Sequence, residues 1–302
     1  MRVRNNVAVW AILALPISTL SANAQDFDNV QISTQQVAPG VYMLMGAGGN
    51  LGVSVGEDAV FLIDDQYAPL TDKIVAAIRE ISDLPIEFVL NTHWHSDHTG
   101  GNENLGEAGA LIVAHDNVRE RMSVEQFMEA FGRTVPASPP GALPIVTFSE
   151  AVTFHINGDE IFVFHVANAH TDGDAIVHFR RANTVHMGDT FFNGLYPFID
   201  VSAGGSIDGM IAAADRVLPL IDDETRVIPG HGTLSNKAGL AEFREMLVGV
   251  REAMAEQIAM GKSLEEVQAA KPTAAWDEKW GQGFLNPETF TRILYSDLSR
   301  KK

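Results

Sequence analysis

The sequence predicts an α/β fold in which helices lie outside a pair of β-sheets. Short runs rich in Val, Ile, Leu and Phe are separated by turn residues, and segments of helical period lie between them. The 302 residues are 46% hydrophobic and 20% charged, so the chain can bury a sizeable core. Strands and helices mixed in this order are most simply arranged as helical layers on sheets.

The first part of the chain predicts an antiparallel meander followed by a helix and a further strand. Residues 41–45, 51–55 and 59–63 are strand-like and are separated by glycine-containing turns. Apolar residues then recur at helical spacing after Pro69, at Leu70, Ile74, Ala77, Ile78 and Ile81. Leu84-Pro85 ends this helix, and residues 86–90 predict a buried strand.

The second part repeats this plan loosely. We expect strands near residues 152–155, 161–166, 175–179 and 184–187, and then a helix over residues 207–221. Between the two parts, residues 134–144 contain four prolines and predict an extended connection across the surface rather than a domain boundary.

The C-terminal part predicts helices. A long helix is indicated by an apolar stripe at Leu240, Phe243, Leu247, Val250 and Met254. Ser263 and Glu266 have the spacing of a capping box before a short helix. We expect the aromatic side chains of Trp276, Trp280 and Phe284 to pack this part onto the body of the protein.

Residues 1–24 have the pattern of a secretory signal peptide. Arg2 and Arg4 precede an apolar run over residues 7–15, and Ala22-Asn23-Ala24 is a small-x-small cleavage signal. An N-terminal anchor helix that stays attached is the alternative, but the apolar run is too short to span a bilayer. We therefore expect residues 25–302 to form a single domain that is periplasmic or secreted.

Charge and cysteine usage exclude several functions. The net charge of −18 counts against binding to nucleic acid or to an anionic membrane surface. The chain has no cysteine, which rules out disulfides, thiolate–metal bonds and a cysteine nucleophile. Any bound metal must therefore be held by His, Asp or Glu.

The chemistry is concentrated in the run from Asn91 to Gly101. This run contains His93, His95, Asp97 and His98 at the point where a buried strand ends. A match to this spacing by chance has odds of about one in a thousand. Side chains two residues apart on an extended segment leave on the same side, so His93 and His95 can bind one cation. Asp97 and His98 can then reach a neighbouring one.

The run resembles the hallmark motif of the metallo-β-lactamase superfamily, and single residues further along the chain extend the resemblance over residues 37–233. His170, before Thr171, resembles the third histidine of the family. Asp189, after Gly188, resembles its bridging carboxylate, and His231, in a Pro-Gly-His-Gly run, resembles its last histidine. Asp64 resembles the aspartate that supports the metal ligands in that family.

The resemblance implies an αββα four-layer sandwich, the metallo-β-lactamase fold, with the site at one edge between the two sheets. It implies two metal ions, the first bound by His93, His95 and His170, and the second by Asp97, His98 and His231, with Asp189 between them. Zinc is the expected metal because imidazoles and carboxylates suit it, although iron or manganese would tolerate the same ligands.

The implied activity is that of a dinuclear zinc hydrolase acting on a small molecule with an activated carbonyl. Two cations about 3.5–4 Å apart lower the pKa of a bridging water, which yields a hydroxide that attacks the carbonyl. Asp97 is expected to orient that hydroxide and to pass on its proton.

Three functions stay open at this point. We expect β-lactam hydrolysis first, because the export signal, the meander before Asp64 and the loop with Asn193 are similar to periplasmic lactamases of this fold. Those enzymes, however, have a cysteine in place of Asp189 and a lysine in place of Phe192. Asp189 with His231 is more similar to glyoxalase II and lactonase branches, so a lactone or thioester hydrolase is the alternative. The third possibility is a non-catalytic periplasmic zinc-binding protein.

Several residues also have plain structural interpretations. We expect the strand histidines His155, His165, His178 and His186 to be hydrogen-bonded and to have no role in the site. Asp189 has the alternative of capping the turn that follows it. The aromatic residues Phe191, Phe192, Tyr196 and Phe198 line a substrate cleft or pack in the core.

Overall fold

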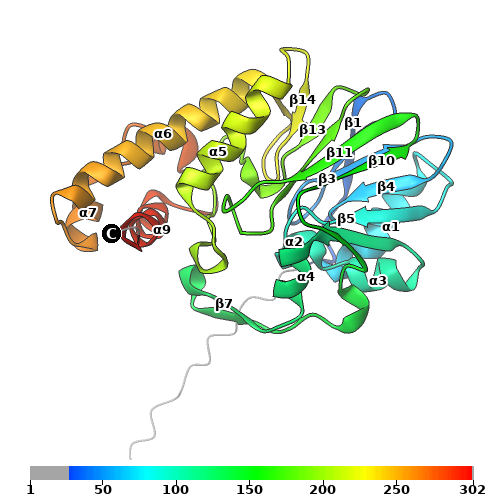
Figure 1. Cartoon of the computed structure of the whole chain (residues 1–302), viewed down its shortest axis with the longest axis horizontal. Helices are drawn as coiled ribbons and strands as arrows, with labels where there is room; N and C mark the ends of the chain where they lie inside the picture. The colour runs from blue at the N-terminus through cyan, green and yellow to red at the C-terminus, as the bar shows by residue number, and fades with distance from the viewer. Residues whose placement is uncertain (1–26, 301–302) are drawn as a thin grey trace, which may run out of the picture.

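The computed structural model describes residues 27–300 as two β-sheets with helices outside them (Figure 1). The expected signal peptide, residues 1–24, lies outside the described residues. Helices α5 (Ile207–Val217) and α6 (Lys237–Ala259) cover one side of the sheet pair, and helices α1 (Thr71–Arg79) and α3 (Asn102–Glu107) cover the other. This arrangement confirms the expected αββα sandwich with C-terminal helices.

The first sheet contains the expected meander. Its strands, in spatial order, are β1 (Ser33–Ala38), β2 (Val41–Met45), β3 (Leu51–Val55), β4 (Val60–Ile63), β5 (Ile86–Leu90), β6 (Leu111–His115) and β9 (Val146–Phe148). Strands β1 to β4 are antiparallel, and helix α1 crosses from β4 to the parallel strand β5. Strand β1 was not expected, because most of its residues are exposed and polar and give no alternating pattern.

The second sheet follows the plan expected for the second part of the chain. Its strands, in spatial order, are β10 (Ala151–Ile156), β11 (Asp159–His165), β12 (Ala175–Phe179), β13 (Thr184–His186), β14 (Arg226–Ile228) and β15 (Ser235–Asn236). The helix expected over residues 207–221 is shorter, because α5 ends at Val217 and a 3-10 turn, Leu218–Leu220, follows. Pro219 lacks the amide hydrogen needed to continue the α-helix.

The core has three apolar clusters, one between the sheets and one under each helical layer. Phe61, Ile63 and Val163 belong to the cluster between the sheets, where the inward faces of both sheets meet. Helix α1 buries Ile74 and Ile78 on the outer face of the first sheet. Helices α5, α6 and α9 (Pro287–Arg300) cover the second sheet in the largest cluster.

The connection expected over residues 134–144 is partly structured. Strands β7 (Gln126–Met128) and β8 (Arg133–Val135) form an antiparallel hairpin, and Pro140–Ala142 forms a 3-10 turn whose Ala142 is buried. The remaining short helices are α2 (Ser96–Thr99), α4 (Asp116–Met122), α7 (Leu264–Ala270) and α8 (Asp277–Trp280). Within residues 27–300, none of the helices combines the length and the apolar character needed to cross a bilayer.

The C-terminal expectations hold except at one aromatic residue. Ser263 and Glu266 form the expected capping box of α7, and Trp280 is buried against the body. The expectation for Phe284 is wrong, because its ring is 64% exposed. The next residue, Leu285, takes the buried position instead and is 2% exposed.

Asn157 links the two sheets through the turn between β10 and β11. Its side-chain amide donates to the Ser54 carbonyl at 3.2 Å and to the Ala59 carbonyl at 2.9 Å, both in the first sheet or its turn. Its Oδ1 accepts from the Ala59 amide at 3.3 Å. The backbone of Asn157 has a φ of 53°, a left-handed conformation that Asn tolerates better than most residues.

We expect Asn157→Ala to lower the free energy of unfolding by about 2–3 kcal/mol, because it removes several hydrogen bonds and strains the left-handed backbone. Asn157→Gly relieves the backbone strain but loses the same hydrogen bonds, so it should recover only part of this loss. Urea denaturation of both variants measures the difference. An Asn157→Gly protein as stable as the parent would show that the inter-sheet hydrogen bonds contribute nothing.

Candidate metal centre

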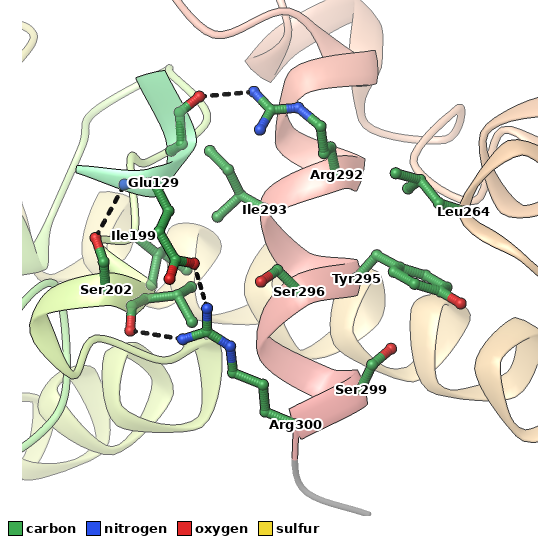
Figure 2. A pocket seen from close by; sticks show the side chains of 12 residues that line it. Glu129, Ile199, Ser202, Leu264, Arg292, Ile293, Tyr295, Ser296, Ser299 and Arg300 are labelled. Carbon is green, nitrogen blue, oxygen red and sulfur yellow. Dashed lines mark hydrogen bonds and ion pairs between the residues drawn. The ribbon is translucent and has the colours of Figure 1, made fainter. Parts of the chain in front are cut away.

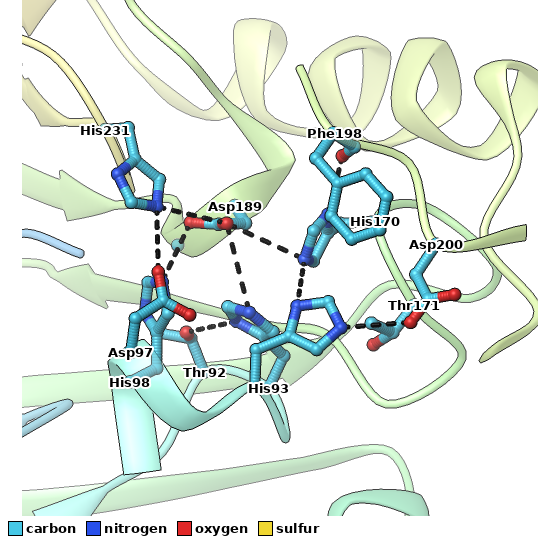
Figure 3. A network of polar contacts seen from close by, with 12 residues as sticks. Thr92, His93, Asp97, His98, His170, Thr171, Asp189, Phe198, Asp200 and His231 are labelled. Carbon is cyan, nitrogen blue, oxygen red and sulfur yellow. Dashed lines mark hydrogen bonds and ion pairs between the residues drawn. The ribbon is translucent and has the colours of Figure 1, made fainter. Parts of the chain in front are cut away.

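The seven predicted ligands lie where strands of both sheets end, and they face one another (Figure 3). The run with His93, His95, Asp97 and His98 follows β5 and enters α2. The other three come from separate loops. His170 lies between β11 and β12, Asp189 lies on the 3-10 turn Gly188–Thr190 after β13, and His231 follows β14.

Their ligand atoms form three overlapping groups, in each of which all atoms lie within 4.8 Å of one another. The groups are His93 with His95 and His170, His93 with His98 and Asp189, and Asp97 with His98 and His231. The structure therefore brings together the residues of both expected sets, with Asp189 between them. Their assignment as ligands is part of the proposal below.

Asp64 holds two of the histidines from outside. Its Oδ2 accepts from His98 Nδ1 at 2.7 Å and from the Thr92 hydroxyl at 2.8 Å, and its Oδ1 accepts from the Thr92 amide at 2.7 Å. The Thr92 hydroxyl oxygen lies 3.1 Å from His93 Nδ1, so that nitrogen donates to it. These contacts point the Nε2 atoms of His93 and His98 at the centre, where each is a ligand atom when it carries no proton.

A second pair of anchors orients His95 and His170. His95 Nε2 donates to Asp200 Oδ2 at 3.0 Å, and His170 Nδ1 donates to the Phe198 carbonyl at 2.7 Å. The inner nitrogens, His95 Nδ1 and His170 Nε2, are only 2.8 Å apart. With neutral rings whose outer nitrogens carry the protons, two lone pairs face each other at this distance, an arrangement that a shared cation stabilises.

Three buried atoms of the centre have no hydrogen-bond partner among the described residues. They are His93 Nε2, His98 Nε2 and Asp189 Oδ1. His98 Nε2 and Asp189 Oδ1 lie 3.1 Å apart, so they pair with each other only when His98 is protonated. An unsatisfied buried nitrogen such as His93 Nε2 costs about 1–3 kcal/mol. All three atoms are good ligands of a divalent cation, and the centre therefore fits metal ions.

Asp189 lies in the middle of the imidazoles. Its carboxylate oxygens lie 3.1 Å from His98 Nε2, 3.4 Å from His231 Nε2, 3.6 Å from His170 Nε2 and 3.9 Å from His93 Nε2. The side chain is 5% exposed. The Asp189 carboxylate is directed at these rings. The alternative that it caps the turn after it therefore does not agree with its contacts.

Burial and charge set the protonation of the centre. Burial lowers the pKa of His93 well below its usual value and that of His170 to about 4, so both rings are neutral at pH 7. Burial alone would raise the pKa of Asp97, but the His98 and His231 imidazoles outweigh it and hold this pKa well below its usual range. Against the effect of burial, the Asp189 and Asp97 carboxylates raise the pKa of His98 well above its usual value and that of His231 to about 9. Because metal binds the neutral imidazole, metal binding to these two rings releases protons.

The centre opens into a cleft of about 370 Å³ with mostly apolar walls. Its lining includes Trp94, Met128, Phe131, Phe192, Phe198 and Phe284 beside His95, Asp97, Asp189 and His231. All four aromatic residues, Phe191, Phe192, Tyr196 and Phe198, pack in the core, and Phe192 and Phe198 also line the cleft. Of the strand histidines set aside, His186 bonds the Asn50 carbonyl and His165 the Asp174 carbonyl.

The sequence analysis missed two residues that support the centre. Asp174 accepts from the amides of His170 at 2.6 Å and Thr171 at 2.8 Å, and its place in the His170 motif was the available signal. Asp200, the partner of His95, is 105 positions away from it along the chain. No local pattern marks Asp200, so only the tertiary structure identifies it.

A family model described as "Metallo-beta-lactamase superfamily" matches residues 47–231. The chain belongs to the metallo-beta-lactamase superfamily. Membership in this superfamily, together with the His/Asp cluster, makes the chain a metallo-hydrolase and confirms the expected enzyme class.

Curated relatives of this superfamily member include two proteins named hydroxyacylglutathione hydrolase. The protein from Polaromonas sp. strain JS666 is 27% identical over 59% of this chain and 60% of its own length. The protein from Nitrosococcus oceani is 26% identical over 77% of this chain and 81% of its own length. The chain thus spans less than two thirds of the first relative.

Solved structures support the superfamily fold. The sec-alkylsulfatase Pisa1 from Pseudomonas sp. superposes with a TM-score of 0.66 at 16% identity, over 88% of this chain and 50% of that protein. A metallo-beta-lactamase from Pontibacter korlensis superposes with a TM-score of 0.59 at 18% identity, over 72% of this chain and 99% of that protein. At these identities the likeness concerns the fold alone.

We expect zinc titration to give two equivalents per chain, and Asp200→Ala to weaken the binding of one of them about 10- to 100-fold, because His95 loses the group that orients it. Competition with a chromophoric chelator measures both quantities. Asp200→Asn keeps an acceptor for His95 and should lose less. Asp215→Ala, which removes a surface partner of Arg244, is the matched control. Equal affinities for the parent and Asp200→Ala would contradict the supporting role of Asp200.

Proposed function

We propose that this protein is an exported dinuclear zinc hydrolase that cleaves a carboxylic thioester or lactone. The observation that carries the proposal is the central carboxylate of Asp189 among imidazoles whose outer nitrogens are anchored. A hard carboxylate can bridge two ions, whereas a thiolate holds a single soft ion most firmly.

Two further observations favour a thioester or lactone. The curated relatives named hydroxyacylglutathione hydrolase carry a name that denotes thioester hydrolysis. In addition, Phe192 is buried and stacks on His231, with ring centroids 5.1 Å apart and planes 17° from parallel. The position where the periplasmic lactamases have a lysine therefore offers no cation to a substrate.

Zinc ions held by these residues would lower the pKa of a water molecule and polarise the substrate carbonyl. Asp97 is the residue we assign to proton transfer. Its carboxylate is 23% exposed towards the cleft and lies 3.3 Å from His231 Nε2. The depressed pKa keeps Asp97 ionised at neutral pH, so its carboxylate can accept a hydrogen bond from the attacking water and orient it. The lowered pKa of a zinc-bound water would let its proton pass through Asp97 to the leaving group.

The walls of the cleft contribute orientation and exclusion of water. Trp94, Phe192 and Phe198 surround the polar centre on its open side. An apolar wall beside a charged centre strengthens the electrostatic interactions inside it. It also selects substrates whose acyl or leaving group is apolar.

Hydrolysis of a β-lactam is the second candidate. Its strained amide presents the same activated carbonyl to the centre. The specific observation in its favour is that Arg133, on strand β8, lines the cleft. Its positive charge could take the place of the lysine that the periplasmic lactamases have at the position of Phe192.

A hydrolysis panel of one thioester, one lactone and one penicillin tests the proposal. For zinc-loaded protein we expect kcat/KM on the thioester or the lactone to exceed that on penicillin by about tenfold or more, and to be lost with chelator. Asp97→Asn should lower kcat about 10²- to 10⁴-fold, with metal content measured alongside. Rates no higher than those of free zinc would support the zinc-binding protein instead, and a preference for penicillin would favour the second candidate.

Export is tested separately. Mass spectrometry of the native protein should show a mature chain that begins near Gln25, because Ala22-Asn23-Ala24 has the form of a cleavage signal. The matched variant Ala24→Arg, with a bulky charged residue at the cleavage signal, should accumulate the uncut chain. An intact N-terminus on parent protein recovered from the cytoplasm would refute export and leave the hydrolase proposal untouched.

A further inference from the structure

The cleft contains one lysine or arginine side chain among its lining residues. This residue is Arg133, on strand β8. The chain carries a net charge of −18, and Asp97 and Asp189 line the same cleft. Arg133 is an exposed residue, and it adds a positive charge to a cleft whose acidic lining residues are Asp97 and Asp189.

The hairpin that carries Arg133 directs it towards the cleft. In the antiparallel pair, Arg133 stands opposite Met128, and residues directly opposite each other lie on the same face. Met128 is 9% exposed and lines the cleft, as does Val135, two positions from Arg133. Phe127, on the opposite face, is 56% exposed. The alternation of the two strands thus gives the hairpin an inner face with Arg133 on it.

Residues of helix α9 contact the turn that joins β7 to β8 (Figure 2). The Arg292 guanidinium donates to the Ala130 carbonyl at 3.0 Å, and the Arg300 guanidinium pairs with the Glu129 carboxylate. The Glu129 amide donates to the Ser202 hydroxyl at 3.3 Å. These contacts hold the turn of the hairpin in one position. Because the hairpin is short, they also restrict the backbone of Arg133 on the adjoining strand.

Arg133 and its neighbour Tyr67 are donors without protein partners. Neither the Arg133 guanidinium nor the Tyr67 hydroxyl has a side-chain hydrogen bond or an ion pair in the described part of the chain, whereas Arg121 pairs with Asp172 at 2.6 Å. Tyr67 lines the same cleft as Arg133. Burial, and then Asp97, raises the pKa of Tyr67 to about 12, so its hydroxyl keeps its proton and donates.

We propose that Arg133 and Tyr67 form an anion-binding subsite that recognises a carboxylate of the substrate. The subsite deepens the proposed function and rests on it, since it assigns the substrate class to that same cleft. The exposed rings of Phe131 and Phe284 at the cleft offer contact to an apolar group. The structure thus assigns a substrate that joins one activated carbonyl, one apolar group and one carboxylate.

Two matched thioesters test this subsite. They are the phenylacetyl thioesters of 4-mercaptobenzoate and of 4-mercaptobenzamide, which differ in one negative charge. Because the chain has no cysteine, the released thiol can be followed with a disulfide reagent without reaction of the protein. The variants are Arg133→Ala, Arg133→Lys and Tyr67→Phe. Arg79→Ala, which removes an exposed arginine at the end of α1, is the control for the change in net charge.

We expect the parent to prefer the benzoate, and Arg133→Ala to raise KM for the benzoate about tenfold at unchanged kcat, because a charge-assisted hydrogen bond is lost. KM for the benzamide should not change. Tyr67→Phe should have a smaller effect in the same direction, and Arg133→Lys should keep part of the preference. Added salt should reduce the preference in the parent and not in Arg133→Ala.

A binding measurement separates this inference from the proposed function. The inert amide 4-(phenylacetamido)benzoate should bind zinc-loaded parent about tenfold more tightly than Arg133→Ala in calorimetry, whether or not either thioester is hydrolysed. A parent that binds this carboxylate but cleaves neither of these thioesters, nor the lactone of the hydrolysis panel, would refute the hydrolase proposal and keep the subsite. Equal binding by the parent and Arg133→Ala, or equal changes for benzoate and benzamide, would overturn the subsite.

Discussion

The convergence of buried nitrogen lone pairs and carboxylates on one small volume is the constraint on which the rest of this structure depends. His93, His98 and Asp189 each direct a buried polar atom at the centre, and two further imidazole nitrogens meet at 2.8 Å. Such a set is unfavourable by itself, because each unpaired group has lost its hydration. Cations at the centre make the same contacts favourable. The hydrogen bonds on the outer side of the imidazoles hold the ligand atoms in the orientation that such cations need.

The backbone meets this constraint at the ends of strands, where the two sheets approach each other. A side chain at Gly49 would place its Cβ 2.0 Å from the His98 ring, and one at Gly230 would place it 2.1 Å from the Asp189 carboxylate. Both positions therefore require glycine. Asp64 has a φ of 58° and turns its carboxylate back towards Thr92 and His98. The side chains of the centre are thus packed by the surrounding loops before any substrate arrives.

The sequence predicts the parts of this centre that are local in the chain, and it misses the parts that are not. The spacing of His93, His95, Asp97 and His98 carries its own signal, because a strand end and a tight turn determine where those side chains point. Alternation and helical period likewise predict β2 to β5 and α1. The His95–Asp200 contact and the outward position of Phe284 depend on how distant segments pack, and no short window contains that information. The hairpin β7–β8 was not predicted for a different reason. Each of its strands has only three residues, which is too short for an alternating pattern to be recognised.

In the proposed function, the metal centre supplies the chemistry and the hairpin that bears Arg133 selects the substrate, so the two roles fall to different parts of the molecule. The metal centre lies within residues 47–231, the segment that matches the superfamily, whereas helix α9 begins at Pro287, beyond that segment. Helix α9 nevertheless supports one wall of the cleft, because Arg292 and Arg300 bind the turn of the hairpin that bears Arg133. A change in the C-terminal helices can therefore alter which substrates are accepted while the buried centre keeps its geometry. This separation explains how a common hydrolytic centre is compatible with the different substrates named for the proteins that share the fold.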